Sequence, residues 1–308
     1  MSELARLERG LRAVLWELRD YLPDLVLIGG WVPHLHRRYG PFADWRGDLS
    51  LTSELDLLVN RHLARAGRPS LPDILTAADF DQAPGSSVNA VWARRADAGE
   101  LIEFLVPFAG RPRRGQVTVP VQEQPGLTAI PLHHVDMLAR HTTVLRIPIL
   151  THRAEVTLEV HVPTLGAYAV NKAYTFSRRG TPNDPGEAPK SAKDLLYLHD
   201  LMAAGAAVAD QIERDVAAVA GGSPADADQV RGAASHLGLA LKGGELGRHL
   251  DVTVSMLMER TGSPDRSRAR ATLLGHLTDL HDILTSIIAE DLEEASPSES
   301  EWEGDDEQ

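Results

Sequence analysis

The spacing of apolar residues predicts an amino-terminal half in which helices alternate with short strands. Leucines at three- and four-residue steps predict a helix over residues 2–22, which Pro23 ends. A second helix is expected over 31–39. Runs rich in apolar and β-branched residues predict strands. These runs lie at residues 25–28, 54–59, 88–94, 101–106, 144–150 and 156–162.

After Pro163 the pattern becomes helical as far as about residue 292. It predicts helices over 164–177 and 191–202, separated by a loop rich in Pro and Gly over 178–189, and then three or four more helices. We therefore expect an α+β protein. A mixed-sheet domain over 1–163 is followed by a helical-bundle domain over 164–292.

Composition and charge exclude several classes of protein. The 308 residues are 43% hydrophobic and 24% charged, and no apolar run approaches the roughly 18 residues that span a bilayer. The chain contains no cysteine, which excludes disulfides, thiolate catalysis and cysteine zinc sites. With no signal-peptide pattern at its amino terminus, we expect a cytoplasmic protein without a membrane partner.

The formal net charge of −13 is concentrated at the carboxy terminus. Acidic residues are concentrated at positions 290–308, which contain no Lys or Arg. The rest of the chain is therefore nearly neutral, and its charge does not argue against an anionic substrate. Residues 293–308 are predicted to be a disordered acidic tail. This tail either promotes solubility or is an arm that contacts a basic partner or covers a basic site.

Two predicted strands carry acidic side chains among apolar ones. Glu54 and Asp56 alternate with apolar residues, so both carboxylates face one side of their strand. They repel each other unless a cation lies between them, and Mg²⁺ prefers carboxylate oxygens together with substrate phosphates. The alternative is a solvated, charged face on an edge strand.

Glu103 is the only charged residue in the run 101–106 and so needs a partner. If its strand lies beside 54–59, Glu103 supplies a third carboxylate. Three acids can hold two metal ions about 4 Å apart, which activate the attacking oxygen and stabilise the leaving one. The alternative is a salt bridge to an arginine.

Two further features concern phosphate binding and the helical half. Gly29 and Gly30 follow a strand and open a helix, where backbone N–H groups can approach a phosphate, although such a pair is usually only a turn. Lys172 and Asp194 lie on the apolar faces of the first two helices after Pro163. Lys172 either extends to solvent, pairs with Asp194, or lines a cleft with it. We expect a partly hydrated cleft, in which losing either residue costs little stability.

These segments together resemble the DNA polymerase β-like nucleotidyltransferases. Residues 27–31 (LIGGW) and 52–59 (TSELDLLV) are similar to the Gly-Gly/Ser and Asp-x-Asp patterns of that superfamily. Three later segments resemble its AbiEii/AbiGii branch, which includes the MenT toxins. They are Leu101–Pro107 (third-acid strand), Lys172–Thr175 (a Lys-x-x-x-Thr motif, one residue shorter here) and Ala192–Asp200 (Lys-Asp helix). The resemblance covers roughly residues 24–202.

The resemblance implies a nucleotidyltransferase domain that transfers a nucleotide from an NTP to a hydroxyl of an acceptor. It implies nucleotide binding by Gly29, Gly30, Thr52 and Lys172, a site for Mg²⁺ or Mn²⁺ at Glu54, Asp56 and Glu103, and catalytic roles for Asp56, Glu103, Lys172 and Asp194. Members of this branch transfer nucleotides in known cases to tRNA ends. The acceptor is therefore expected to be tRNA or protein, in a bacterial toxin–antitoxin or abortive-infection system with a cognate antitoxin.

The chain departs from the family pattern at the entry to the acidic strand. Glu54 stands where the family usually has Asp, and Ser50 where it often has Arg, for which Arg46 is a substitute. These departures favour a second hypothesis, a catalytically inactive nucleotidyltransferase-like binding or regulatory module. A third, a His-Asp metal phosphohydrolase, rests on His199-Asp200 and His281-Asp282 and lacks further ligands that can be placed.

Overall fold

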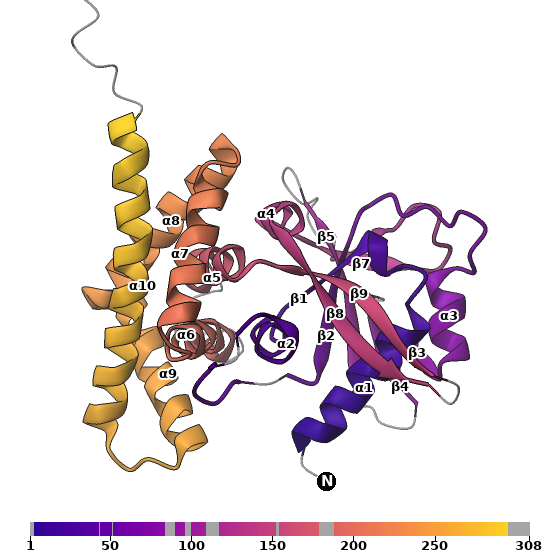
Figure 1. The fold of residues 1–308 in the computed structure, drawn as a ribbon, viewed down its shortest axis with the longest axis horizontal. Coiled ribbons are helices and arrows are strands. Elements are labelled where there is room, and N and C mark those ends of the chain that lie inside the picture. Colours follow the sequence, from indigo (N-terminus) through magenta and orange to yellow (C-terminus); the bar gives the residue numbers. More distant parts are fainter. Residues whose placement is uncertain are drawn as a thin grey trace, which may run out of the picture.

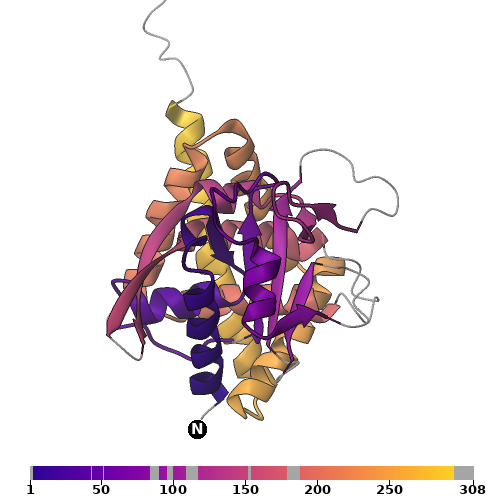
Figure 2. The ribbon, with the colours of Figure 1, turned by 90° about the vertical axis from the view of Figure 1, so that its right-hand side faces the viewer.

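The computed structural model describes residues 3–42, 44–50, 52–83, 90–95, 100–108, 117–151, 154–178 and 188–294. Within these ranges the amino-terminal half is built on one mixed sheet of nine strands, and the carboxy-terminal half is a helical bundle (Figure 1). The bundle lies behind the sheet when the molecule is viewed from the sheet side (Figure 2). The predicted α+β class is confirmed.

The predicted helices and strands are present in the expected order. Five short elements that the apolar pattern did not predict lie among them: Leu71–Ala77, Phe80–Gln82, Val119–Pro120, Thr128–Leu132 and Asp136–Arg140. In chain order the helices and strands are α1 (Glu3–Glu17), β1 (Leu25–Ile28), α2 (Trp31–Tyr39), β2 (Glu54–Val59), α3 (Leu71–Ala77), β3 (Phe80–Gln82), β4 (Val91–Arg94), β5 (Leu101–Pro107), β6 (Val119–Pro120), β7 (Thr128–Leu132), α4 (Asp136–Arg140), β8 (Thr142–Leu150), β9 (Glu155–Pro163), α5 (Leu165–Thr175), α6 (Ala188–Met202), α7 (Ala206–Ala220), α8 (Pro224–Leu241), α9 (Gly244–Thr261) and α10 (Arg266–Glu294). Short 3₁₀ helices occupy Leu22–Asp24 and Phe176–Arg178.

Some predicted boundaries were wrong. The first helix ends at Glu17, because residues 18–24 form turns and a 3₁₀ helix in place of a last α-turn. Pro189 lies in the first turn of α6 and not in a loop. Proline is tolerated there because backbone N–H groups in the first turn have no partner within the helix. The rest of the predicted loop before Pro189, residues 179–187, lies outside the described ranges, as do positions 88 and 89 of the strand predicted over 88–94.

The sheet order places the two acidic strands side by side. Its strands run β3-β4-β5-β2-β1-β9-β8, with β7 beside β5 and β6 beside β7. β1 is antiparallel to β2, and β5 is parallel to β2. In register, Asp56 lies between Ile28 of β1 and Glu103 of β5. The condition for a shared carboxylate site, adjacency of these two strands, is therefore met.

The two faces of the sheet pack against different parts of the molecule. Leu55 and Leu57 belong to an apolar core that includes α1, whereas Leu58 and Leu105 belong to a core shared with the helical bundle. Because side chains alternate along a strand, Asp56 and Glu103 lie on the bundle side. The second core contains residues on both sides of position 163, and the predicted domain boundary there stays a prediction.

The helical bundle places α5 and α6 toward the sheet and α10 on the outside (Figure 1). The Thr164 side chain caps α5 by accepting a hydrogen bond from the Ala167 N–H at 3.3 Å. No helix in the described part of the chain is sufficiently long and apolar to span a membrane. Residues 295–308, most of the predicted acidic tail, lie outside the described ranges.

Candidate active site

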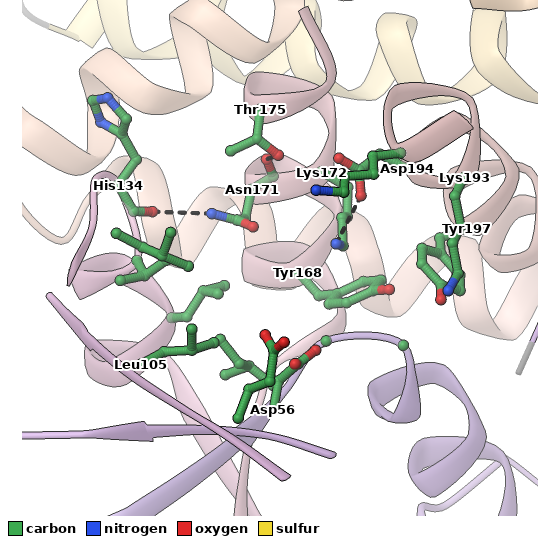
Figure 3. Close-up of a pocket in the computed structure, with 18 of the residues that line it drawn as sticks. Asp56, Leu105, His134, Tyr168, Asn171, Lys172, Thr175, Lys193, Asp194 and Tyr197 are labelled. Atoms are coloured by element: carbon green, nitrogen blue, oxygen red, sulfur yellow. Dashed lines mark hydrogen bonds and ion pairs between the residues drawn. The ribbon is translucent and has the colours of Figure 1, made fainter. Parts of the chain in front are cut away.

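A cavity of about 740 Å³ lies between the bundle side of the sheet and helices α5 and α6 (Figure 3). All the site residues predicted from the sequence line it: Gly29, Gly30, Thr52, Glu54, Asp56, Glu103, Lys172 and Asp194. The fold therefore brings together positions that are up to 165 residues apart in the chain. The roles assigned to them stay predictions at this point.

The acidic wall of the cavity centres on Asp56. Glu103 is its neighbour on β5, and Glu54 lies two residues earlier on the same face of β2. Burial and the carboxylates of Glu103 and Glu54 raise the pKa of Asp56 to about 7, against the opposing charge of Lys172. Burial and the Glu54 charge likewise raise the pKa of Glu103. Like charges are thus gathered at partly buried positions.

This acidic wall fits a divalent cation that also binds phosphate. Among the described residues, no three His, Cys, Asp or Glu side chains are grouped closely enough to hold a metal ion by themselves. Mg²⁺ commonly uses one or two carboxylates and completes its shell with substrate phosphates and water. Asp56 and Glu103 supply such a pair, and Glu103 makes no salt bridge to an arginine within the described ranges.

The lack of a metal-ligand group among the described residues also weighs against a His-Asp phosphohydrolase. His199 contacts His276, with 2.9 Å between their Nδ1 atoms, and Asp200 forms an ion pair with Arg260. His281 lies 3.6 Å from Asp282. The described residues contain no metal-ligand group around either pair.

Both glycines of the β1–α2 turn are required by close approach. Gly29 has a φ of +75°, and a Cβ atom at this position would collide with the Asp56 carboxylate. A Cβ at Gly30 would lie 2.7 Å from Thr52 Cγ2 and would also meet the Tyr197 hydroxyl. Helix α2 begins directly after these glycines, so its amino terminus, which favours anions, lies at the cavity.

On the helical wall, Lys172 Nζ donates a hydrogen bond to Asp194 Oδ1 at 2.8 Å. Lys172 is 8% exposed and Asp194 2% exposed, so the expected partial hydration is wrong, and Lys172 does not extend to solvent. The two residues form a buried ion pair and also line the cavity, which combines two of the alternatives open from the sequence. The ammonium group further lies 5.5 Å from the ring of Tyr168 and 5.3 Å from that of Tyr197.

Sequence reasoning missed other cations on the same wall. Arg178, Lys190 and Lys193 also line the cavity. Lys193 lies 5.8 Å from the Tyr197 ring, and its charge opposes the rise in the pKa of Asp56. The signal was present in the sequence, because Lys190, Lys193 and Tyr197 are spaced at three- and four-residue steps along α6 and so share one face.

The chain segment that enters β2 is held by the helical bundle. Arg260 of α9 donates to Ser50 Oγ at 2.7 Å and to Asp200 Oδ2 at 2.8 Å. Asp200 Oδ2 also accepts the Ser50 backbone N–H at 2.8 Å. The guanidinium at Ser50 is therefore that of Arg260 and not of Arg46, whose side chain is exposed and does not line the cavity.

Comparison with known families gives one finding for this chain. A family model described as nucleotidyltransferase matches residues 14–218, about two thirds of the chain. The matched span contains Gly29, Asp56, Glu103 and Asp194, whereas Arg260 lies beyond it. No curated protein and no solved structure matches the chain.

Proposed function

The chain belongs to this nucleotidyltransferase family, and from that premise we propose that it transfers a nucleotide from an NTP to a hydroxyl of an acceptor with the help of Mg²⁺ or Mn²⁺. One observation carries the proposal: Asp56 and Glu103 face a wall containing Lys172 and Lys193 across one cavity. Acids on one side and cations on the other suit a triphosphate that shares a divalent ion with the protein.

Each wall has its own task in this proposal. Asp56 and Glu103 would hold the divalent ion, with the Glu54 carboxylate beside them at the exposed end of β2. An ion held there would supply charge neutralisation on the phosphates and a lower pKa for the attacking hydroxyl. Gly29 and Gly30 leave room for phosphate oxygens to reach backbone N–H groups at the start of α2.

The cations of the helical wall bind the remaining phosphate charge. Lys193 projects toward the cavity from α6 and forms no ion pair among the described residues, so it is available to a phosphate oxygen. Lys172 of α5 is positioned by Asp194 of α6 and contacts a phosphate oxygen from α5. Asp194 lies beside it as the carboxylate that can accept the proton of the acceptor hydroxyl.

For the acceptor, the resemblance to the AbiEii/AbiGii branch supports tRNA or a protein, and for the biological role it supports the toxin of a system with a cognate antitoxin. The alternative is an inactive module that binds NTP and acts through partners. Binding without transfer distinguishes this module from an enzyme.

The test is incubation of the protein with each α-labelled NTP, Mg²⁺ and a total cell extract, followed by separation of RNA and protein. We expect label from one or more NTPs in an RNA or protein fraction, and none with Asp56→Ala. Asp282→Ala is the matched control, because Asp282 is 71% exposed on α10 and does not line the cavity. NTP binding without any label transfer would contradict the proposal and favour the inactive module.

A further inference from the structure

Beside its charged walls, the cavity has an apolar part with a buried amide. Ile28, Leu105, Ile130, Leu132 and Leu138 line this part together with Asn171 of α5. In Figure 3, Asn171 lies between His134 and the Lys172–Asp194 pair. An apolar wall with a few precisely placed polar groups is the usual lining of a site for a flat organic ring.

The orientation of the Asn171 amide is fixed by its partner. Asn171 Nδ2 donates to the backbone carbonyl of His134 at 3.0 Å. Because a carbonyl can only accept, the amide nitrogen must face His134 and Oδ1 must face away from it. Figure 3 shows this arrangement, with the amide oxygen on the side of the cavity.

Asn171 Oδ1 is thereby presented as a hydrogen-bond acceptor. The residue is 6% exposed, and within the described ranges its Oδ1 accepts no hydrogen bond. Oδ1 is not fully buried and Asn171 lines the cavity, so a donor on a bound molecule can reach this acceptor.

The backbone that holds the amide is itself strained. His134 has a φ of +64°, in the left-handed region that residues other than glycine rarely adopt. Its ring packs edge-on against Tyr174, with 4.7 Å between ring centroids. Such strain persists only where the surrounding structure enforces it, and it is concentrated at binding sites. Here its effect is to place the carbonyl that orients Asn171.

We propose that Asn171 Oδ1 accepts a hydrogen bond from the exocyclic amino group of the incoming nucleobase, an inference that rests on the proposed function of the same cavity. The site then prefers nucleotides with an amino group at C4 of a pyrimidine or C6 of a purine, CTP or ATP, to their oxo counterparts, UTP or ITP. An oxo group at this position would place two acceptors together, with no donor between them. The expected preference is about 10- to 100-fold in affinity.

The test is a calorimetric titration of the full-length protein, with Mg²⁺, against CTP, UTP, ATP and ITP. We expect the amino member to bind more tightly in whichever pair gives measurable binding. Asn171→Leu removes the acceptor at similar volume, and we expect it to reduce the preference to less than about threefold. Thr175→Val is the matched control, because it removes another polar group of α5 that lines the cavity and leaves Oδ1 in place.

Equal affinity within each pair for the wild-type protein would overturn the inference, whether or not the Asn171 variant folds. A preference that survives in a folded Asn171→Leu protein would also overturn it. Titration with inorganic tripolyphosphate, which has no base, shows whether only the role of Asn171 fails or the proposed function fails too. If tripolyphosphate and NTPs bind but amino and oxo bases are not distinguished, only the role of Asn171 fails. If none of them binds, the proposed function fails as well.

Discussion

The two walls of the cavity bury charge in opposite ways. The two buried acids of α6 each have their own cation: Asp194, which lines the cavity, pairs with Lys172 at 2.8 Å, and Asp200, which does not line it, pairs with Arg260 at 2.7 Å. On the sheet wall, Asp56 lies beside Glu103, and burial together with this like charge raises the pKa of Asp56 to about 7. The buried acids of the helical wall are thus neutralised by cations of the protein, whereas the like charges of the sheet wall favour positive charge from a bound species.

The sheet wall gives the largest expected effect. We expect Asp56→Asn to reduce nucleotide transfer by about 10⁴-fold or more, because the proposed function makes Asp56 a ligand of the divalent ion, and the substitution would remove that ligand. We expect no fall in melting temperature, because the substitution removes a charge that burial and Glu103 disfavour. The checks are a transfer assay and a thermal melt on the same preparation. Unchanged transfer in the folded variant would remove Asp56 from the site.

Removing a charge from the helical wall should lower stability, in contrast to Asp56→Asn. Lys172→Met leaves the Asp194 carboxylate buried without its cation, and we expect a loss of about 3–5 kcal/mol in the free energy of unfolding. Lys172→Met/Asp194→Leu removes both charges and should recover most of that loss. Urea unfolding of the single and double variants measures the coupling. A single-variant loss below about 1 kcal/mol would show that the pair contributes little, as the sequence-based expectation had it.

The contrast between the walls also explains how much the sequence could predict. The strand at 54–59 and its acidic face follow from alternation within six residues, and the strand at 25–28 from a short apolar run before two glycines. The adjacency of Asp56 and Glu103 could only be assumed from the sequence. Strands β3 and β4 lie between β2 and β5 in the chain, but in the sheet β2 and β5 are direct neighbours.

The helical wall was harder to predict because its contacts are distant in the chain. Periodicity placed Lys172 and Asp194 on inner faces but could not distinguish a hydrated cleft from a 2.8 Å ion pair. Arg260 lies 210 residues after Ser50, and no local pattern relates the two. Asn171 reads as an ordinary helix residue, and its orientation depends on a strained carbonyl 37 residues earlier.

The connection between the walls gives a smaller expected effect. Arg260→Lys keeps the charge beside Asp200 but loses the forked contact that also holds Ser50, and we expect about 1–2 kcal/mol less stability. Because Ser50 precedes the segment that enters β2, we also expect a severalfold lower kcat. Tripolyphosphate affinity should be unchanged, since Arg260 does not line the cavity. A fall in tripolyphosphate affinity equal to the fall in kcat would instead place Arg260 in phosphate binding.

The smallest expected effect tests the least buried acid. Glu54 is exposed at the start of β2, whereas Asp56 is partly buried two residues later, so shortening Glu54 creates no cavity in the core. The family resemblance places Asp at this position, and Glu54→Asp moves the carboxylate back by about one bond toward that arrangement. We therefore expect the unfolding free energy of Glu54→Asp to lie within about 0.5 kcal/mol of the wild type.

We expect nucleotide transfer by Glu54→Asp to be equal to that of the wild type or up to severalfold faster, with Glu54→Ala as the slow reference. The measurement is transfer at several Mg²⁺ concentrations, because a displaced carboxylate changes the concentration needed for half-maximal rate before it changes the maximal rate. If Glu54→Asp is as slow as Glu54→Ala at saturating Mg²⁺, the longer side chain is itself required, and the sheet wall differs from the family arrangement at its first acid.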